Sequence, residues 1–198
     1  MSSEPKSRLL SLLLNNAGMI RFGLLAAFLF TSFFVVYNGY IYGSDFFIGY
    51  LELSADLASW LLNSVFQMNT AVVEIRQDIF TKIVAEPGSK IYVVVARGCD
   101  ASTVFAVLIA TVMAWPGPWL RRAVVCLVGL LLMYVLNLLR IAGMLLVELH
   151  APQHFDLFHE WILPNILIVG ALLYFYGWVV YSNAHPADED NARNQAGA

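Results

Sequence analysis

Runs of apolar residues long enough to cross a lipid bilayer constrain this chain more than any other feature. A membrane-spanning helix needs about 20 consecutive and mainly apolar residues, and Ile20–Tyr42 meets this length with one charged residue, Arg21. Hydrophobic residues make up 60% of the 198 residues and charged residues only 13%, against roughly 45–50% and 25% in soluble domains. The sequence therefore predicts a mainly α-helical integral membrane protein. The net charge of −3 gives no reason to expect nucleic acid as a partner.

The N-terminal region resembles a signal peptide only superficially. Lys6, Arg8 and Arg21 precede the uncharged apolar run Phe22–Tyr42, but this run has about the length of a full span and ends in tyrosines without a small-residue cleavage pattern. We interpret residues 20–42 as a retained first span, preceded by a cytoplasmic arm over residues 1–19.

Three further spans are expected, which gives a bundle of about four transmembrane helices. They cover residues 99–115, 123–149 and 161–182, joined by loops at 116–122 and 150–160 and followed by a cytoplasmic tail at 183–198. Arg121 and Arg122 in the first of these loops indicate the cytoplasmic side, because short cytoplasmic loops carry an excess of basic residues. Residues 43–98, Cys99 and the 150–160 loop are then all extracytoplasmic.

The extracytoplasmic segment 43–98 is predicted to hold an amphipathic helix and a small β-hairpin. The polar residues of Phe46–Phe66 recur at helical spacing and define one face: Glu52, Asp56, Ser59 and Asn63. A helix with such a stripe and a broad apolar side fits the membrane surface better than its interior. Beyond it, the β-branched stretches Ala71–Ile75 and Lys90–Val95 flank a strong turn signal at residues 86–89.

Cys99 lies where this β-branched run meets the second span, directly after Gly98. Most cysteines are small buried hydrophobes, but a position near a helix N-terminus favours the thiolate. Arg97 favours it as well, whereas Asp100 opposes it. Cys126 lies near the cytoplasmic end of the third span. It is therefore too far from Cys99 for a disulfide, and we expect it to be structural.

Arg140 is the most unusual residue of the third span. An arginine at this depth costs roughly 2.5–3.5 kcal/mol on insertion scales, so it should face the bundle interior and have a partner. It shares a helix face with Asn137 and Glu148. Two roles stay open: a structural ion pair with Glu148, Glu52 or Asp56, or a clamp for a carbonyl oxygen that develops negative charge.

The outer loop carries three histidines: His150, His154 and His159. His159 borders the fourth span and can point toward the bundle, and a cysteine with a histidine base is the pattern for acyl transfer through a thioester. One alternative is a zinc-dependent hydrolase that uses Cys99 and the three histidines as ligands. Another is a non-catalytic membrane scaffold with Arg140 in a structural ion pair.

Three short motifs in this order resemble the exosortase/archaeosortase family of transmembrane cysteine transpeptidases, most closely the H-type exosortases of Gram-negative bacteria. They are Gly98-Cys-Asp-Ala101, Asn137-Leu-Leu-Arg-Ile141 and Phe155-Asp-Leu-Phe-His159. The resemblance covers roughly residues 70–182. The family usually has glycine two residues after the cysteine, whereas this chain has Ala101, and alanine disfavours positive φ.

The resemblance implies an inner-membrane thiol protease or transpeptidase whose active site faces the periplasm. Its expected substrates are exported proteins with a PEP-CTERM-like signal, which consists of a short motif, a membrane span and a basic cluster. Cys99 is implied as the nucleophile, Arg140 as the oxyanion or substrate clamp, and His159 as the general acid and base, with Asn137, Arg97 and Glu148 in support. No cofactor and no metal are expected. The lipid bilayer is expected as a partner. The acceptor stays open between water, an amine, a glycan and a lipid.

Overall fold

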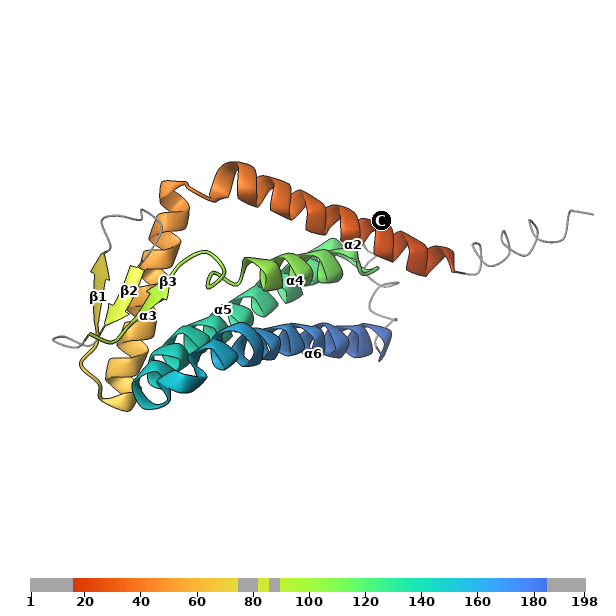
Figure 1. Cartoon of the computed structure of the whole chain (residues 1–198). Coiled ribbons are helices and arrows are strands. Elements are labelled where there is room, and N and C mark those ends of the chain that lie inside the picture. Colours follow the sequence, from red (N-terminus) through yellow and green to blue (C-terminus); the bar gives the residue numbers. More distant parts are fainter. Residues whose placement is uncertain (1–15, 75–81, 86–89, 185–198) are drawn as a thin grey trace, which may run out of the picture.

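A computed structural model describes residues 16–74, 82–85 and 90–184 of the chain. Long helices form an elongated bundle, and a small sheet lies at one end of it (Figure 1). The N-terminal end of α2, the turn between α4 and α5, and the end of α6 lie at the opposite end of the molecule (Figure 1). The turn between α4 and α5, which is followed by Arg121 and Arg122 and is called the basic turn below, is thus far from the sheet, whereas the loop of Cys99 between β3 and α4, called the cysteine loop, lies on the side of the sheet.

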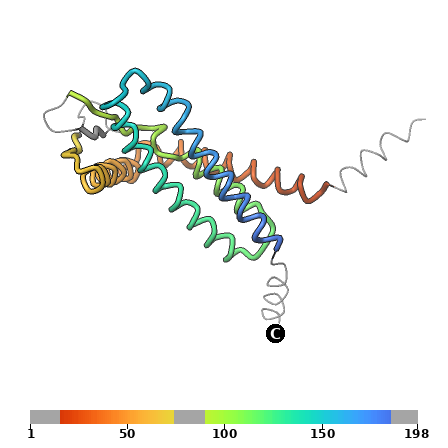
Figure 2. Tube along the Cα trace, turned by 90° about the horizontal axis from the view of Figure 1, so that it is seen from below, coloured from red at the N-terminus to blue at the C-terminus, as the bar shows by residue number. Residues whose placement is uncertain are grey.

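The first helix, α2 (Ala17–Val36), continues into a π-helical turn, η1 (Tyr37–Ile41). Helix α3 (Asp45–Phe66) follows, and its N-cap Ser44 accepts a hydrogen bond from the Phe47 amide. In Figure 2, α3 is seen nearly along its axis while α5 and α6 run lengthwise, so α3 crosses the end of the bundle. This orientation places α3 beside the C-terminal part of α5, which it contacts.

The sheet is antiparallel and has three strands, β1 (Ala71–Glu74), β2 (Lys82–Ala85) and β3 (Tyr92–Val95), in the order β1-β2-β3. The two strands expected from the sequence are present, but they do not pair with each other. The unexpected strand β2 lies between them, with Val84 opposite Val72 on one side and opposite Val93 on the other. The turn expected at residues 86–89 lies outside the described residues. Among the described strands, β3 lies at one edge of the sheet.

The C-terminal half consists of α4 (Ser102–Ala114), α5 (Trp119–His150) and α6 (Leu163–Ala184). A short 3₁₀ turn, η2 (Pro152–His154), and a π-helical turn, η3 (Leu157–Ile162), connect α5 to α6. α5 has 32 residues and is about 48 Å long. It therefore extends well beyond the thickness of a bilayer and contacts both the other helices and the sheet.

Three helical stretches are long and apolar enough to cross a membrane: Ala17–Ile41, Trp119–His150 and Leu157–Ala184. The mainly α-helical class expected from the sequence is confirmed at this level. The second expected span, residues 99–115, differs, because its helix has only 13 residues and begins at Ser102. The expected arm and tail lie mostly outside the described residues.

Two hydrophobic clusters hold the described part of the chain together. One joins α4, α5 and α6 around Leu108, Met133 and Leu167. There α5 and α6 approach closely at Gly129, where a Cβ would lie 2.6 Å from the ring of Tyr174. The other cluster joins α3, β3 and the outer part of α5, and it positions the cysteine loop.

The polar stripe expected on α3 does not form a single solvent-facing surface. Ser59 is buried, and its hydroxyl lies 2.7 Å from the hydroxyl of Thr70. The Asn63 side chain also bonds to Thr70, accepting from its backbone N–H at 2.7 Å. Asp56 is exposed. The two uncharged members of the stripe thus fasten the start of the sheet to α3, which periodicity alone did not reveal.

Candidate active site

Cys99 lies on a short non-helical loop between β3 and α4, three residues before the first helical residue. Gly98 has φ of 91°, and Ala101, the N-cap of α4, has φ of 56°. Alanine in this left-handed conformation costs about 1–2 kcal/mol. The position at which the resembling family carries glycine thus has the backbone geometry that favours glycine. The carbonyls of the three residues before Ala101 are each held by a side chain, which constrains the backbone that leads into this geometry.

Two side chains of α5 donate hydrogen bonds to the carbonyls of Gly98 and Cys99, which lie on either side of the Cys99 Cα. Arg140 Nη1 donates to the carbonyl of Gly98 at 3.2 Å, and Asn137 Nδ2 donates to the carbonyl of Cys99 at 2.8 Å. Both side chains are buried, with 7% and 0% of their surface exposed. A loop at this depth has no strand or helix partner for its carbonyls, and these side chains supply the missing donors.

Asp100 is held from the opposite side by two tyrosines. The Tyr50 hydroxyl on α3 donates to its backbone carbonyl at 2.8 Å, and the Tyr37 hydroxyl donates to its carboxylate at 2.5 Å. The backbone N–H of Gly98 donates to the same carboxylate at 3.1 Å. Burial raises the pKa of Tyr50 well above its ordinary value, and the negative charge of Asp100 adds to the effect. The Asp100 carboxylate thus accepts hydrogen bonds from Tyr37 and Gly98, and its backbone carbonyl accepts one from Tyr50.

Neither tyrosine was identified from the sequence. Tyr37 and Tyr50 precede Asp100 by 63 and 50 residues, and nothing in their local sequence indicates this contact. The sequence did contain one sign that Asp100 needs a partner: a carboxylate beside an apolar span must be either exposed or paired. The structure shows it 3% exposed and paired.

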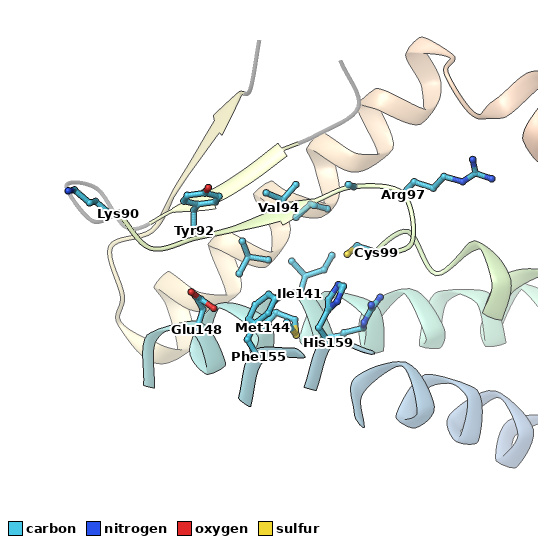
Figure 3. A pocket seen from close by; sticks show the side chains of 14 residues that line it. Lys90, Tyr92, Val94, Arg97, Cys99, Ile141, Met144, Glu148, Phe155 and His159 are labelled. Atoms are coloured by element: carbon cyan, nitrogen blue, oxygen red, sulfur yellow. The ribbon is translucent and has the colours of Figure 1, made fainter. Parts of the chain in front are cut away.

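A pocket of about 580 Å³ opens beside Cys99. Figure 3 shows β3 and the cysteine loop along one side of it, and α5 with Phe155 and His159 along the other. His159 lies on η3, is half-buried, and stacks on Phe155 with ring centroids 5.7 Å apart. Cys99, Arg140 and His159 thus line the same cavity, although they come from three different elements.

The expected supporting residues occupy different places. Glu148 lines the far part of the same pocket, whereas Asn137 lies beneath the loop. Arg97 borders the pocket, but its side chain points away from Cys99 (Figure 3). It donates to Asn38 at 2.6 Å and lies 4.4 Å from the ring centroid of Tyr42. Arg97 therefore fastens the outer side of the loop to η1.

The other two histidines of the outer loop lie outside the pocket lining. His150 and His154 are both exposed, and a ring nitrogen of His150 lies 2.9 Å from the carbonyl of Leu146. Within residues 16–74, 82–85 and 90–184, no group of three or more His, Cys, Asp or Glu side chains is arranged to hold a metal ion. The zinc alternative thus finds no ligand set in this part of the chain.

Arg140 has no carboxylate within ion-pair distance among the described residues. Its Nε atom is buried without a hydrogen-bond partner in that same set. The ion pair considered from the sequence, with Glu148, Glu52 or Asp56, is not present there. Among the described residues, the guanidinium therefore bonds to the carbonyl of Gly98, and it lines the adjoining cavity.

Cys126, the second cysteine, is buried in α5 within the cluster formed by α4, α5 and α6. It lies outside the lining of the pocket beside Cys99. The described part of the chain therefore has one cysteine, Cys99, that faces a cavity together with a histidine and an arginine. Comparisons of the chain with protein-family models, with curated proteins and with solved structures find no match in any of the three.

Proposed function

We propose that this protein is a membrane cysteine peptidase or transpeptidase of the exosortase type, which cleaves the C-terminal sorting signal of exported proteins. One observation carries the proposal: Cys99, Arg140 and His159 line a single pocket beside a loop whose backbone is fixed by buried side chains. A nucleophile, a base and an unneutralised cation around one cavity are the groups that acyl transfer requires.

The level of the site along the bundle supports action at the outer membrane surface. Arg122 and Arg140 are 18 residues apart on α5, which corresponds to about 27 Å along the helix axis. The hydrocarbon core of a bilayer is about 30 Å thick. With the basic turn at the cytoplasmic surface, the cysteine loop therefore lies close to the outer boundary. The remaining outer part of α5 then stands in the periplasm.

The short helix α4 fits the same arrangement as a fourth membrane-crossing segment. Its 13 residues cover only about 20 Å, so the cysteine loop must complete the crossing. Non-helical backbone at membrane depth is tolerated where protein groups satisfy its polar atoms. The side chains of Arg140, Asn137 and Tyr50 do this for three successive carbonyls.

The chemistry follows the cysteine–histidine pattern. His159 removes the proton from the Cys99 thiol, and the thiolate attacks the carbonyl carbon of the scissile peptide bond. The C–S bond forms, negative charge develops on the carbonyl oxygen, and the guanidinium of Arg140 stabilises it. Collapse breaks the C–N bond, and His159 returns its proton to the leaving amine. An acceptor nucleophile then attacks the thioester and releases the Cys99 thiolate, which regains its proton.

The substrate class follows from the level of the pocket. A protein anchored by its own C-terminal span presents the peptide segment just outside that span at the height of Cys99. Anchoring in the same membrane raises the effective concentration of this segment, so even a shallow pocket suffices for recognition.

Co-expression with a tagged reporter tests the proposal. The reporter joins a soluble domain to a C-terminal signal made of a PEP-CTERM-like motif, a membrane span and a basic cluster. We expect the wild-type enzyme to shorten the reporter and Cys99→Ala to leave it at full length, whereas the matched control Cys126→Ala retains processing. A shortened reporter with Cys99→Ala would refute the assignment of the nucleophile.

A further inference from the structure

β3 presents an unpaired edge at the pocket that contains Cys99. It is the last strand in the order β1-β2-β3, and within the described part of the chain its backbone pairs only with β2. Alternate residues of such an edge strand direct their N–H and C=O groups outward. All four residues of β3 line the pocket: Tyr92, Val93, Val94 and Val95.

The sequence of this edge lacks the features that usually protect an edge strand. Natural edges are blunted by charged residues, proline or a bulge, whereas Tyr92–Val95 is Tyr-Val-Val-Val in regular register with β2. Tyr92 and Val94 are 53% and 36% exposed. An apolar edge of this kind can pair with a further strand, and here the edge strand is followed by the loop that carries Cys99.

We infer that the substrate binds as an added β-strand along the free edge of β3, so that its main chain is recognised by backbone hydrogen bonds. This inference rests on the proposed function and specifies how the same site takes its substrate, an extended peptide. Strand addition of this kind derives affinity from main-chain bonds and specificity from alternate side chains.

The direction of the added strand follows from the anchoring of the substrate. β3 runs from Lys90, at the far end of the pocket, toward Cys99 (Figure 3). The exported part of the substrate precedes the scissile bond, and its membrane span follows it. The peptide must therefore approach Cys99 from the far end of the pocket, which makes it parallel to β3.

A second cavity supports this path. It is about 220 Å³ in volume and lies on the other side of the cysteine loop, against Ser102 of α4 and Pro164 and Leu167 of α6. Arg140 lines both cavities. A chain that leaves the edge of β3 and passes the loop enters this second cavity, where the part that follows the scissile bond continues toward the membrane.

The opposite wall of the pocket defines the side chains that fit. Ile141 and Met144 of α5 and Phe155 face β3 across it (Figure 3). Every second side chain of the added strand points toward this apolar wall, because strand side chains alternate between faces. Glu148 and Lys90 both line the end of the pocket that lies farther from Cys99 (Figure 3), so polar recognition is concentrated several residues before the scissile bond.

Cysteine cross-linking in membranes tests the inference. The chain has two cysteines, so Cys99→Ala with Cys126→Ala gives a full-length protein that lacks thiols and does not cleave its substrate. Tyr92→Cys or Val94→Cys is added singly, and Leu173→Cys on the exposed face of α6 is the control. The tagged reporter carries one cysteine at successive positions before the scissile bond, and disulfides are formed by a mild oxidant.

For a parallel strand, Tyr92→Cys captures a reporter position about two residues farther from the scissile bond than Val94→Cys does, and Leu173→Cys captures none. Capture of the same position by both, capture in the reverse order, or no capture would overturn the inference. Its failure is distinct from that of the proposed function: where the wild type shortens the reporter and Cys99→Ala does not, a missing cross-linking pattern refutes only strand addition, whereas cleavage in Cys99→Ala refutes both.

Backbone methylation of competing peptides tests the main-chain bonds directly. Synthetic peptides of the reporter segment before the scissile bond carry one N-methyl group at successive positions and compete with the cross-link. We expect about a tenfold weaker competition at every second position and little change at the positions between. Equal effects at successive positions, or none at all, would show that side chains alone are recognised.

Discussion

The side-chain amide of Asn137 donates a hydrogen bond to the carbonyl of Cys99, 38 residues earlier in the chain. Asn137 is fully buried, and its other amide atom, Oδ1, has no partner among the described residues. Such a residue contributes through one specific bond and not through packing alone. The bond joins α5 to the residue that we propose as the nucleophile.

Replacement of Asn137 tests how far the loop depends on this bond. Asn137→Leu leaves the Cys99 carbonyl buried without a donor, which costs about 1–3 kcal/mol. We expect a lower thermal unfolding temperature and processing reduced by at least tenfold in the folded protein. Asn183→Leu, at the exposed end of α6, is the control and should behave as wild type. Unchanged processing by a correctly folded Asn137→Leu would show that the bond is dispensable.

Arg140 is expected to require its guanidinium group and not merely a positive charge. Arg140→Lys retains the charge but loses the planar fork of donors that reaches the Gly98 carbonyl and the cavity together. We expect processing to fall by about a hundredfold or more, with the protein still recovered from membranes. Wild-type processing by Arg140→Lys would indicate a general electrostatic role. Loss of the folded protein in both Arg140→Lys and Arg140→Ala would instead favour a structural role.

Replacement of the three outer histidines by alanine should affect processing to very different degrees. His159→Ala removes the group that we assign as general base, a contribution of about 10²–10⁴-fold in rate. His150→Ala and His154→Ala alter exposed residues outside the pocket lining and should retain nearly full processing. Initial rates of reporter shortening at equal enzyme levels compare them. A defect as large in His154→Ala as in His159→Ala would contradict the assignment.

Ala101 should accept glycine but not a β-branched residue. Ala101→Gly relieves the strain of the left-handed backbone and loses one buried methyl group. The two effects nearly cancel, so we expect a change within about 1 kcal/mol and processing that is retained. Ala101→Val should destabilise the protein by about 2 kcal/mol or more, because positive φ is a genuine outlier for such residues. Thermal unfolding in detergent measures both, and tolerance of valine would argue against this loop geometry.

Alkaline pH should weaken the hold of Tyr50 on the loop. Burial raises the pKa of Tyr50 above its ordinary value of 10.0. Its contribution is therefore fully present below about pH 10 and is lost as the pH rises further, because the unfolded chain ionises first. The free energy of unfolding should fall by up to about 1.4 kcal/mol per pH unit from this group.

Thermal unfolding between pH 8 and 11 checks this expectation. Tyr50→Phe should show a shallower loss above pH 10 than wild type and a lower stability at pH 8, since its bond to the Asp100 carbonyl is absent. Tyr176→Phe, exposed on α6, should follow the wild-type curve. Identical slopes for wild type and Tyr50→Phe would exclude the proposed linkage.

The sequence predicted those elements whose structure is decided by a single local property, such as the length of an apolar run or a high content of β-branched residues. The apolar runs gave the long helices to within a few residues, because few alternatives exist for about 20 apolar residues in a row. The β-branched stretches around residues 71–75 and 90–95 gave two of the three strands. β2, by contrast, was missed, because Lys82–Ala85 is too short to show a period of its own.

The candidate site was predictable in its members but not in its contacts. Cys99, Arg140 and His159 were singled out by residue type and position in the chain. An ion pair with a carboxylate was one of two roles left open for Arg140, whereas the structure gives it the carbonyl of Gly98 among the described residues. Likewise, Ser59 and Asn63 were expected on a polar surface and instead bond to Thr70. Periodicity defines a helix face but not what the rest of the fold places against it.

The order in which the chain is synthesised gives the fastening of the cysteine loop a further consequence. The loop leaves the ribosome before α5. The carbonyls of Gly98 and Cys99 therefore lack their donors until Arg140 and Asn137, which lie 42 and 38 residues later, have been synthesised. At about 5–20 residues per second, this delay lasts roughly 2–8 s. During that interval the thiol lacks its positioned cation and its histidine. Under the proposed function, the catalytic set therefore stays incomplete until His159, 60 residues after Cys99, has also been synthesised.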